Sequence, residues 1–105
     1  MKNLTKHPMI RSKAIRSAAN GECCTWPGCG AIYGVVLAHS NMSIHGKAKG
    51  QKAHDIFSAF LCNEHHFVYD KDTALSQKEK EWNFMRAMSA TILRSFHLEL
   101  IEVKP

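Results

Sequence analysis

The chain has 105 residues, 45% of them hydrophobic, which suits one domain with a modest core and argues against wholesale disorder. Its 14 lysines and arginines outnumber 9 acidic residues, and the resulting net charge of +5 favours a polyanionic partner. No apolar run is long enough to cross a membrane, and the N-terminus lacks the apolar stretch of a signal peptide. We therefore expect a cytoplasmic protein without membrane association, in which the 4 cysteines are metal ligands rather than disulfide partners.

The first half of the chain predicts one helix and one hairpin. Residues 1–10 are expected to form a flexible basic arm, because Pro8 discourages a helix there. Residues 11–19 contain good helix formers and predict a short helix whose basic side chains either face solvent or contact phosphate. Residues 31–39 are rich in strand formers and predict a short hairpin that ends at His39.

A polar loop and a long helix are predicted in the second half. Residues 40–54 interleave glycines with lysines and predict a loop. Asp55 either caps a helix that starts near Ile56, or precedes an apolar run that leads, buried, into Cys62. A short helix is expected over residues 63–71. The stripe that predicts a core-facing helix over residues 76–96 consists of Trp82, Met85, Met88 or Ser89, Ile92, Leu93 and Phe96. Residues 98–103 are expected to form a closing strand.

Two cysteine- and histidine-containing segments have the spacing of zinc ligands. Four residues separate Cys24 from Cys29, and two separate Cys62 from His65. Both spacings suit a tetrahedral site to which two chain segments each donate a pair of ligands. In a small domain such a metal site also supplies part of the folding energy. We therefore predict a structural Zn²⁺ held by Cys24, Cys29, Cys62 and His65.

Three interpretations of the cysteine and histidine set compete. A two-Cys, two-His finger through His39 and His45 is disfavoured, because only nine residues separate Cys29 from His39, where a finger needs about twelve. A second interpretation is a structural zinc module that binds nucleic acid or protein without chemistry. The third is a metal-dependent nuclease of the HNH (ββα-metal, His-Me finger) type on a treble-clef scaffold. There, a hairpin carries a general-base histidine and the following helix carries a metal-binding histidine, the order of His39 and His66.

The chain resembles a family of small phage and prophage nucleases typified by YbcO. The resemblance covers about half of the chain, in order, and its most specific part is the ending, where His65 replaces a cysteine usual in the family. It also pairs Cys23 with the family's first cysteine, so that Cys23 competes with Cys24, although the spacing to Cys29 favours Cys24. The matching motifs are Gly21-Glu22-Cys23, Pro27-Gly28, Cys29, Val36-Leu37-Ala38-His39, His45-Gly46-Lys47, Lys52-x-x-Asp55 and Leu61-Cys62-x-x-His65-His66-x-x-x-Asp70.

The resemblance implies hydrolysis of nucleic-acid phosphodiester bonds, with DNA as the expected substrate. His39 would act as general base, and His66 would hold a catalytic Mg²⁺ or Mn²⁺. Because Ala38 stands where many HNH enzymes have a further ligand, Asp70 or Asp55 is expected to supplement His66. Asp55 has two further possible roles, to orient His39 or to cap its helix. The residues expected to contact nucleic acid are His45, Lys47, Lys49 and Lys52.

These observations predict a small α+β domain over residues 11–105, with a treble-clef zinc centre and a long C-terminal helix. The function expected of it is that of a metal-dependent endonuclease encoded by a phage or prophage. The alternative is a non-catalytic, zinc-stabilised DNA-binding module.

Overall fold

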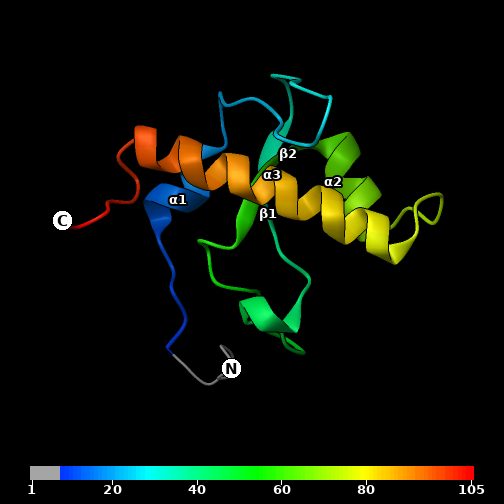
Figure 1. Ribbon diagram of the computed structural model, residues 1–105, viewed down its shortest axis with the longest axis horizontal. Helices are drawn as coiled ribbons and strands as arrows, with labels where there is room; N and C mark the ends of the chain where they lie inside the picture. The colour runs from blue at the N-terminus through cyan, green and yellow to red at the C-terminus, as the bar shows by residue number, and fades with distance from the viewer. Residues whose placement is uncertain (1–7) are drawn as a thin grey trace.

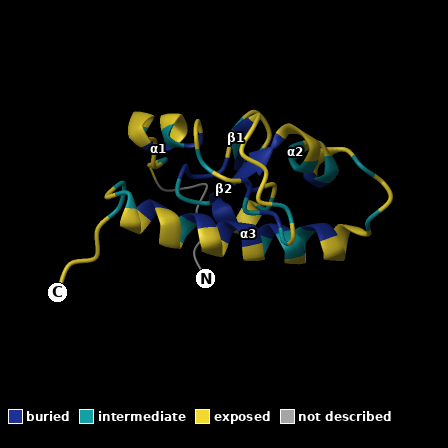
Figure 2. Cartoon of the chain, turned by 90° about the horizontal axis from the view of Figure 1, so that it is seen from above, coloured by how far each residue is buried: buried dark blue, intermediate teal, exposed yellow. Residues whose placement is uncertain are grey.

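The computed structural model describes residues 8–105, which form two strands and three α-helices. The strands pair antiparallel, and the long C-terminal helix packs along the second of them (Figure 1). Figure 2 shows this helix on one side of the strands and the two shorter helices toward the other. The elements are α1 (Lys13–Ala18), β1 (Val35–His39), the 3-10 turn η2 (Ser43–His45), β2 (Ser58–Cys62), α2 (Asn63–Asp70) and α3 (Gln77–His97). The predicted small α+β domain with a long C-terminal helix is confirmed.

The partner of β1 is a distant segment, not the other arm of a local hairpin. Val35 lies opposite Cys62, and His39 lies opposite Ser58. The prediction of a hairpin within residues 31–39 was therefore wrong. All five residues of β2 are buried, so this strand needs cover on both faces and on both edges. Of the two roles considered for residues 55–61, the buried approach to Cys62 is confirmed, since a strand and not a helix follows Asp55.

The edge of β2 that does not face β1 is closed by two threonines. The backbone N–H of Thr25 donates to the carbonyl of Phe60 at 2.8 Å. The N–H of Phe60 donates to the side-chain oxygen of Thr91, on α3, at 3.0 Å. These bonds satisfy backbone groups that would otherwise be buried without partners. They also fix the segment that contains Cys24 and Cys29 against the sheet.

Helix α3 begins as predicted, but its buried face matches the predicted one only in part, because Met88 is buried and Met85 and Ile92 pack against the core. A capping box between Ser76 and Glu79 starts it. Trp82, Leu93 and Phe96, expected in the core, are 66%, 59% and 43% exposed. The helix instead buries a stripe with several small side chains, which allows its backbone to approach β2 closely. This stripe consists of Lys80, Phe84, Ala87, Met88, Thr91 and Ser95.

No strand forms over residues 98–103, contrary to expectation. The N–H of Leu100 donates to the carbonyl of Ser95, and the N–H of Glu99 donates to that of Phe96. Glu99 has a φ of 61°. This is the Schellman arrangement that satisfies the last carbonyls of a helix. The cap of α3 therefore uses the residues with which the expected strand would have begun.

The segment before α1 is attached to the loop that precedes β2. Residues 1–7 of the expected basic arm lie outside the described residues. Further along, the N–H of Ile10 donates to Nδ1 of His54 at 2.9 Å, and the N–H of Asp55 donates to the carbonyl of Ile10 at 3.0 Å. The side chain of Ser12 then caps α1 by accepting a bond from the N–H of Ile15. Helix α1 is thereby anchored beside Asp55.

None of the described helices is both long and apolar enough to cross a membrane.

Candidate functional site

A cluster of cysteines and a histidine forms where the segment 24–29 meets the start of α2. The sulfur of Cys24 lies 3.7 Å from Nδ1 of His65, and the sulfur of Cys62 lies 3.3 Å from the same nitrogen. The sulfurs of Cys29 and Cys62 are 4.0 Å apart. All four donor atoms lie within 4.8 Å of one another. The cluster predicted from the sequence is therefore assembled, and it could hold a metal ion.

These distances fit a metal ion with tetrahedral coordination better than a disulfide bond. Sulfurs about 2.3 Å from a central zinc ion would be separated by about 3.8 Å, close to the spacing observed. A disulfide would need about 2.05 Å, and all the cysteines are free. Burial raises the pKa of the Cys24 thiol to about 12, against the opposing effect of hydrogen bonds from the backbone of Cys62 and Trp26. A bound cation must displace this proton, so metal affinity is expected to fall as the pH falls.

The turn between Cys24 and Cys29 is built to bring the two sulfurs together. The N–H of Cys29 donates to the carbonyl of Trp26, and the N–H of Cys24 donates to that of Ala31. The N–H of Ala31 also lies 3.5 Å from the sulfur of Cys29. The Trp26 ring stacks on His65, with ring centroids 5.4 Å apart. Cys23 is exposed and outside the cluster, so the geometry favours Cys24 over Cys23 as the ligand.

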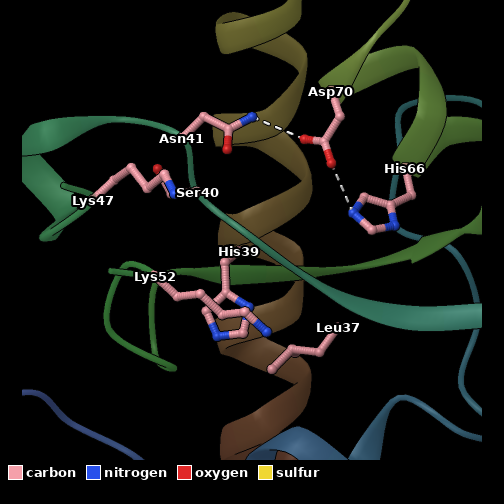
Figure 3. A pocket seen from close by; sticks show the side chains of 8 residues that line it. All are labelled: Leu37, His39, Ser40, Asn41, Lys47, Lys52, His66 and Asp70. Atoms are coloured by element: carbon pink, nitrogen blue, oxygen red, sulfur yellow. Dashed lines mark hydrogen bonds and ion pairs between the residues drawn. The ribbon is translucent and has the colours of Figure 1, made fainter. Parts of the chain in front are cut away.

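A polar cleft of about 220 Å³ opens between β1, the 40–52 loop and α2 (Figure 3). Helix α3 passes behind the strands in this view, so the cleft lies on the face away from α3. The short helix α2 links the cleft to the Cys/His cluster, because it begins directly after Cys62 and ends at Asp70. The lining residues are Leu37, His39, Ser40, Asn41, Lys47, Lys52, His66 and Asp70.

His39 is held in the cleft by Asp55. Its Nε2 lies 2.8 Å from Oδ1 of Asp55, and its side chain is 14% exposed. Asp55 is buried, and its other oxygen accepts a 2.7 Å bond from the N–H of Ser12. Because a carboxylate can only accept, Nε2 carries the ring proton, and Nδ1 is left free to accept one. Of the roles left open for Asp55, the contact with His39 is present.

Several groups besides His39 stabilise the negative charge of the Asp55 carboxylate. Burial alone raises the pKa of this carboxyl, but the bonds from His39 and Ser12, with the charges of His39 and Arg11, hold the pKa below its usual value. Arg11 and Arg16 approach its oxygens at 3.4 and 3.5 Å. Asp55 is therefore ionised at neutral pH and fixed from several directions. Because Asp55 is the group that holds Nε2, this fixes His39 as well.

On the other wall of the cleft, His66 pairs with Asp70. Nε2 of His66 lies 3.0 Å from Oδ2 of Asp70, one helical turn further on. The side-chain amide of Asn41 donates to Oδ1 of Asp70 at 2.9 Å, as Figure 3 shows, and its backbone N–H donates to the Tyr69 hydroxyl at 2.8 Å. Among residues 8–105, no third His, Cys, Asp or Glu joins this pair to make a cluster of three ligands. Asp55 points to His39 instead.

Two residues expected to contact nucleic acid lie elsewhere. His45 is buried, its Nδ1 bonds to the Ser40 hydroxyl at 2.6 Å, and burial lowers its pKa. Its side chain is therefore part of the core, and this burial does not favour the direct contact with nucleic acid that was expected of it. Lys49 is exposed on the loop but does not line the cleft. Lys47 and Lys52 both do, as Figure 3 shows.

Sequence reasoning missed the polar groups that support the site. Arg11 was noted only as a basic helix residue, yet its guanidinium donates to the carbonyls of Ala53 and Lys52 at 2.6 and 2.8 Å. Asn41 was not singled out, although it holds Asp70. Ser12 acts through its backbone N–H, which no residue type reveals. Only the position of Arg11 at the start of a basic helix hinted at such a role.

No protein-family model, curated protein or solved structure matches this chain.

Asp55→Asn keeps His39 in place but changes the group that holds its Nε2, so it tests whether the orientation of the His39 ring matters. An amide can donate to Nε2 of His39, which would move the ring proton to Nδ1 and block it as an acceptor. If the cleft hydrolyses a substrate with His39 as its base, the kcat should fall on the order of 10²-fold, with little change in KM. The matched control is Asp72→Asn, since the Asp72 carboxylate accepts a bond from the backbone N–H of Ala74 and is outside the cleft. Equal kcat values for the two variants would show that the orientation of His39 by Asp55 does not affect turnover.

Proposed function

We propose that this chain is a metal-dependent endonuclease that hydrolyses phosphodiester bonds in nucleic acid, with DNA as the expected substrate. The proposal rests above all on one observation. His39, held through Nε2 by a buried carboxylate, shares a cleft with two lysines and with the His66–Asp70 pair. A base, cationic groups for phosphate and candidate metal ligands are the components that such a hydrolysis requires.

In the proposed reaction, His39 removes a proton from the attacking water through Nδ1. The resulting hydroxide attacks phosphorus in line, and the bond to the leaving oxygen breaks, so that this oxygen keeps the electron pair and takes a proton from water. The proton on Nε2 stays in the bond to Asp55, which stabilises the imidazolium that forms. Lys47 and Lys52 bind the phosphate oxygens and oppose the negative charge that builds on them.

The donor set of the opposite wall suits a divalent cation. An imidazole and a carboxylate are ligands of Mn²⁺ and, less usually for the imidazole, of Mg²⁺. His66 and Asp70 would hold the ion, which would stabilise charge on the phosphate and the leaving oxygen. Asn41 would keep the Asp70 carboxylate turned toward His66.

We further propose that the Cys/His cluster holds a structural Zn²⁺ and that the domain is of the treble-clef type. Two ligands come from a tight turn, and two come from the end of β2 and the first turn of α2. Two sulfur–nitrogen pairs and a sulfur pair at tetrahedral spacing support zinc. The ion would fix the start of α2 and thereby the position of His66.

The alternative is a zinc-stabilised module that binds DNA without cutting it. One observation favours it, namely that among the described residues the His66–Asp70 pair lacks a third protein ligand. Mg²⁺ often keeps several waters and needs few protein ligands, so a pair does not exclude catalysis. The two functions share the basic cleft and differ in the need for His39.

The proposal is tested by incubating the zinc-loaded chain with single-stranded DNA, duplex DNA, branched DNA and RNA at a fixed Mn²⁺ concentration. We expect new 5′ or 3′ ends in at least one substrate. His39→Ala, prepared in parallel, controls for contaminating nucleases. Binding to a substrate that stays intact throughout the panel would support the alternative and reject the endonuclease.

Lys47 and Lys52 are expected to contribute more to substrate binding than Lys49. A hydrogen bond to a charged group contributes about 1.5–3 kcal/mol, roughly tenfold or more in affinity. The double variant Lys47→Gln/Lys52→Gln should therefore raise the KM for nucleic acid at least roughly tenfold. Lys49→Gln is the matched control, because Lys49 belongs to the same loop and lies outside the cleft. An equal rise in KM in the double variant and in Lys49→Gln would show that the loop acts through its overall positive charge and not through contacts in the cleft.

A further inference from the structure

Positive charge is concentrated in the part of the chain that surrounds the cleft. Between Pro8 and Lys52 the sequence holds six basic residues and one acidic residue, Glu22. The Glu22 carboxylate forms an ion pair with Arg94, whose Nε lies 2.6 Å from it. From Ala53 to the C-terminus, acidic residues outnumber basic ones. Within residues 8–105, the excess positive charge therefore comes from the start of α1 with the preceding Arg11, and from the three lysines of the 46–52 loop.

Helix α1 is fastened to that loop by Arg11. The guanidinium of Arg11 donates to the carbonyl of Lys52 at 2.8 Å and to that of Ala53 at 2.6 Å. Arg16, in α1, approaches Asp55, which also contacts His39. Lys52 lines the cleft. The start of α1 and the lysine-bearing loop that lines the cleft are thus neighbours.

The cations in and just before α1 are only partly neutralised within residues 8–105. One carboxylate, Asp55, serves both Arg11 and Arg16 as well as His39. The Arg16 side chain remains 51% exposed. Lys13 forms no ion pair among residues 8–105. Because Lys13 and Arg16 are three residues apart on a helix, they share one side of it.

We propose that Lys13 and Arg16 form a second phosphate-binding surface, which continues the cleft along α1. Its partner is a nucleic-acid strand that extends past the phosphate bound in the cleft. Neighbouring phosphates of one strand are about 3.4 Å apart along the helix axis, so a strand seated at Lys52 brings further phosphates toward α1. This inference rests on the proposed function, because it takes the cleft as the site of a phosphodiester.

The test is the salt dependence of binding to a fluorescein-labelled DNA duplex of about two helical turns, measured by fluorescence anisotropy. Each phosphate contact contributes roughly 0.9 to the slope of log K against log salt. Lys13→Gln should lower the magnitude of this slope by roughly 0.9, and Lys13→Gln/Arg16→Gln by roughly twice that. The control is Arg86→Gln, which removes the same charge from an exposed position of α3 and should leave the slope unchanged.

Two results would contradict the proposal that Lys13 and Arg16 bind phosphate. One is an unaltered slope in both α1 variants, and the other is an equal loss in Arg86→Gln, which would reflect net charge alone. Lys13 has no ion pair to lose, so the single variant keeps the test valid if Arg16→Gln disturbs folding. Binding is measured without added Mg²⁺ or Mn²⁺ and needs no turnover. If the variants change the slope as predicted but the wild type cleaves nothing, the endonuclease is rejected and the α1 surface is retained. If the wild type cleaves DNA but the slopes are unchanged, the α1 surface is rejected and the endonuclease is retained.

Discussion

His39→Ala is expected to slow nucleic-acid cleavage by roughly 10²–10⁴-fold while binding persists, because loss of a general base alone has that effect. The fold should survive, since the Asp55 carboxylate keeps its bonds to Ser12, Arg11 and Arg16. The Cys/His cluster also lies at the other end of the sheet from His39, which pairs with Ser58 and not with Cys62. Zinc content and thermal unfolding temperature should therefore match those of the wild-type chain.

His97→Ala provides the matched control for this variant, because His97 is exposed at the end of α3. Cleavage rates should be measured at saturating substrate, so that a change in binding does not disguise a change in kcat. If His39→Ala cleaves as fast as His97→Ala, His39 is not the base. If His39→Ala loses stability and keeps its specific activity, His39 is a structural residue of the sheet.

Cys62→Ala is expected to release zinc and unfold the domain, so that binding and cleavage disappear together. Zinc binding in small zinc-finger peptides contributes about 10–16 kcal/mol at neutral pH. That is comparable to or larger than the total stability of an ordinary domain, about 5–15 kcal/mol. Cys62 joins β2 to α2, so its loss also frees the start of the helix that carries His66 and Asp70.

Cys23→Ala is the control, because Cys23 is exposed and outside the cluster. Elemental analysis should return about one zinc per chain for the wild type and for Cys23→Ala, and far less for Cys62→Ala. Since the Cys24 thiol must lose its proton to bind, zinc affinity should fall as the pH is lowered. A Cys62→Ala variant that melts as the wild type does would show that the metal does not stabilise this fold.

The sequence was most informative where ligand chemistry constrains spacing. The pairs Cys24–Cys29 and Cys62–His65 predicted the cluster, because four metal ligands leave few arrangements. The start of α3 was equally predictable, since Ser76 and Glu79 form a capping box from local signals alone. The contact between Asp55 and His39 was one of several alternatives, because a buried carboxylate has many possible partners.

The strand partner of β1 and the buried face of α3 depend on tertiary contacts, which local sequence patterns do not encode. The strand ending at His39 found its partner in residues 58–62, a choice that local propensity does not encode. The buried face of α3 follows small residues such as Ala87, Thr91 and Ser95, so the exposed Trp82 misled a prediction based on hydrophobicity. Support from backbone groups, such as the N–H of Ser12, is invisible in residue types.

The central claim is that the cleft around His39 hydrolyses phosphodiesters with the help of a divalent ion at His66 and Asp70. Its most direct test is the initial rate of DNA cleavage by zinc-loaded wild-type and His66→Ala chains, as a function of added Mg²⁺ or Mn²⁺. We predict cleavage only when the ion is added, and a requirement for a higher ion concentration in His66→Ala. Cleavage that is independent of added ion, or no cleavage by the wild type at any concentration of either ion, would contradict the account.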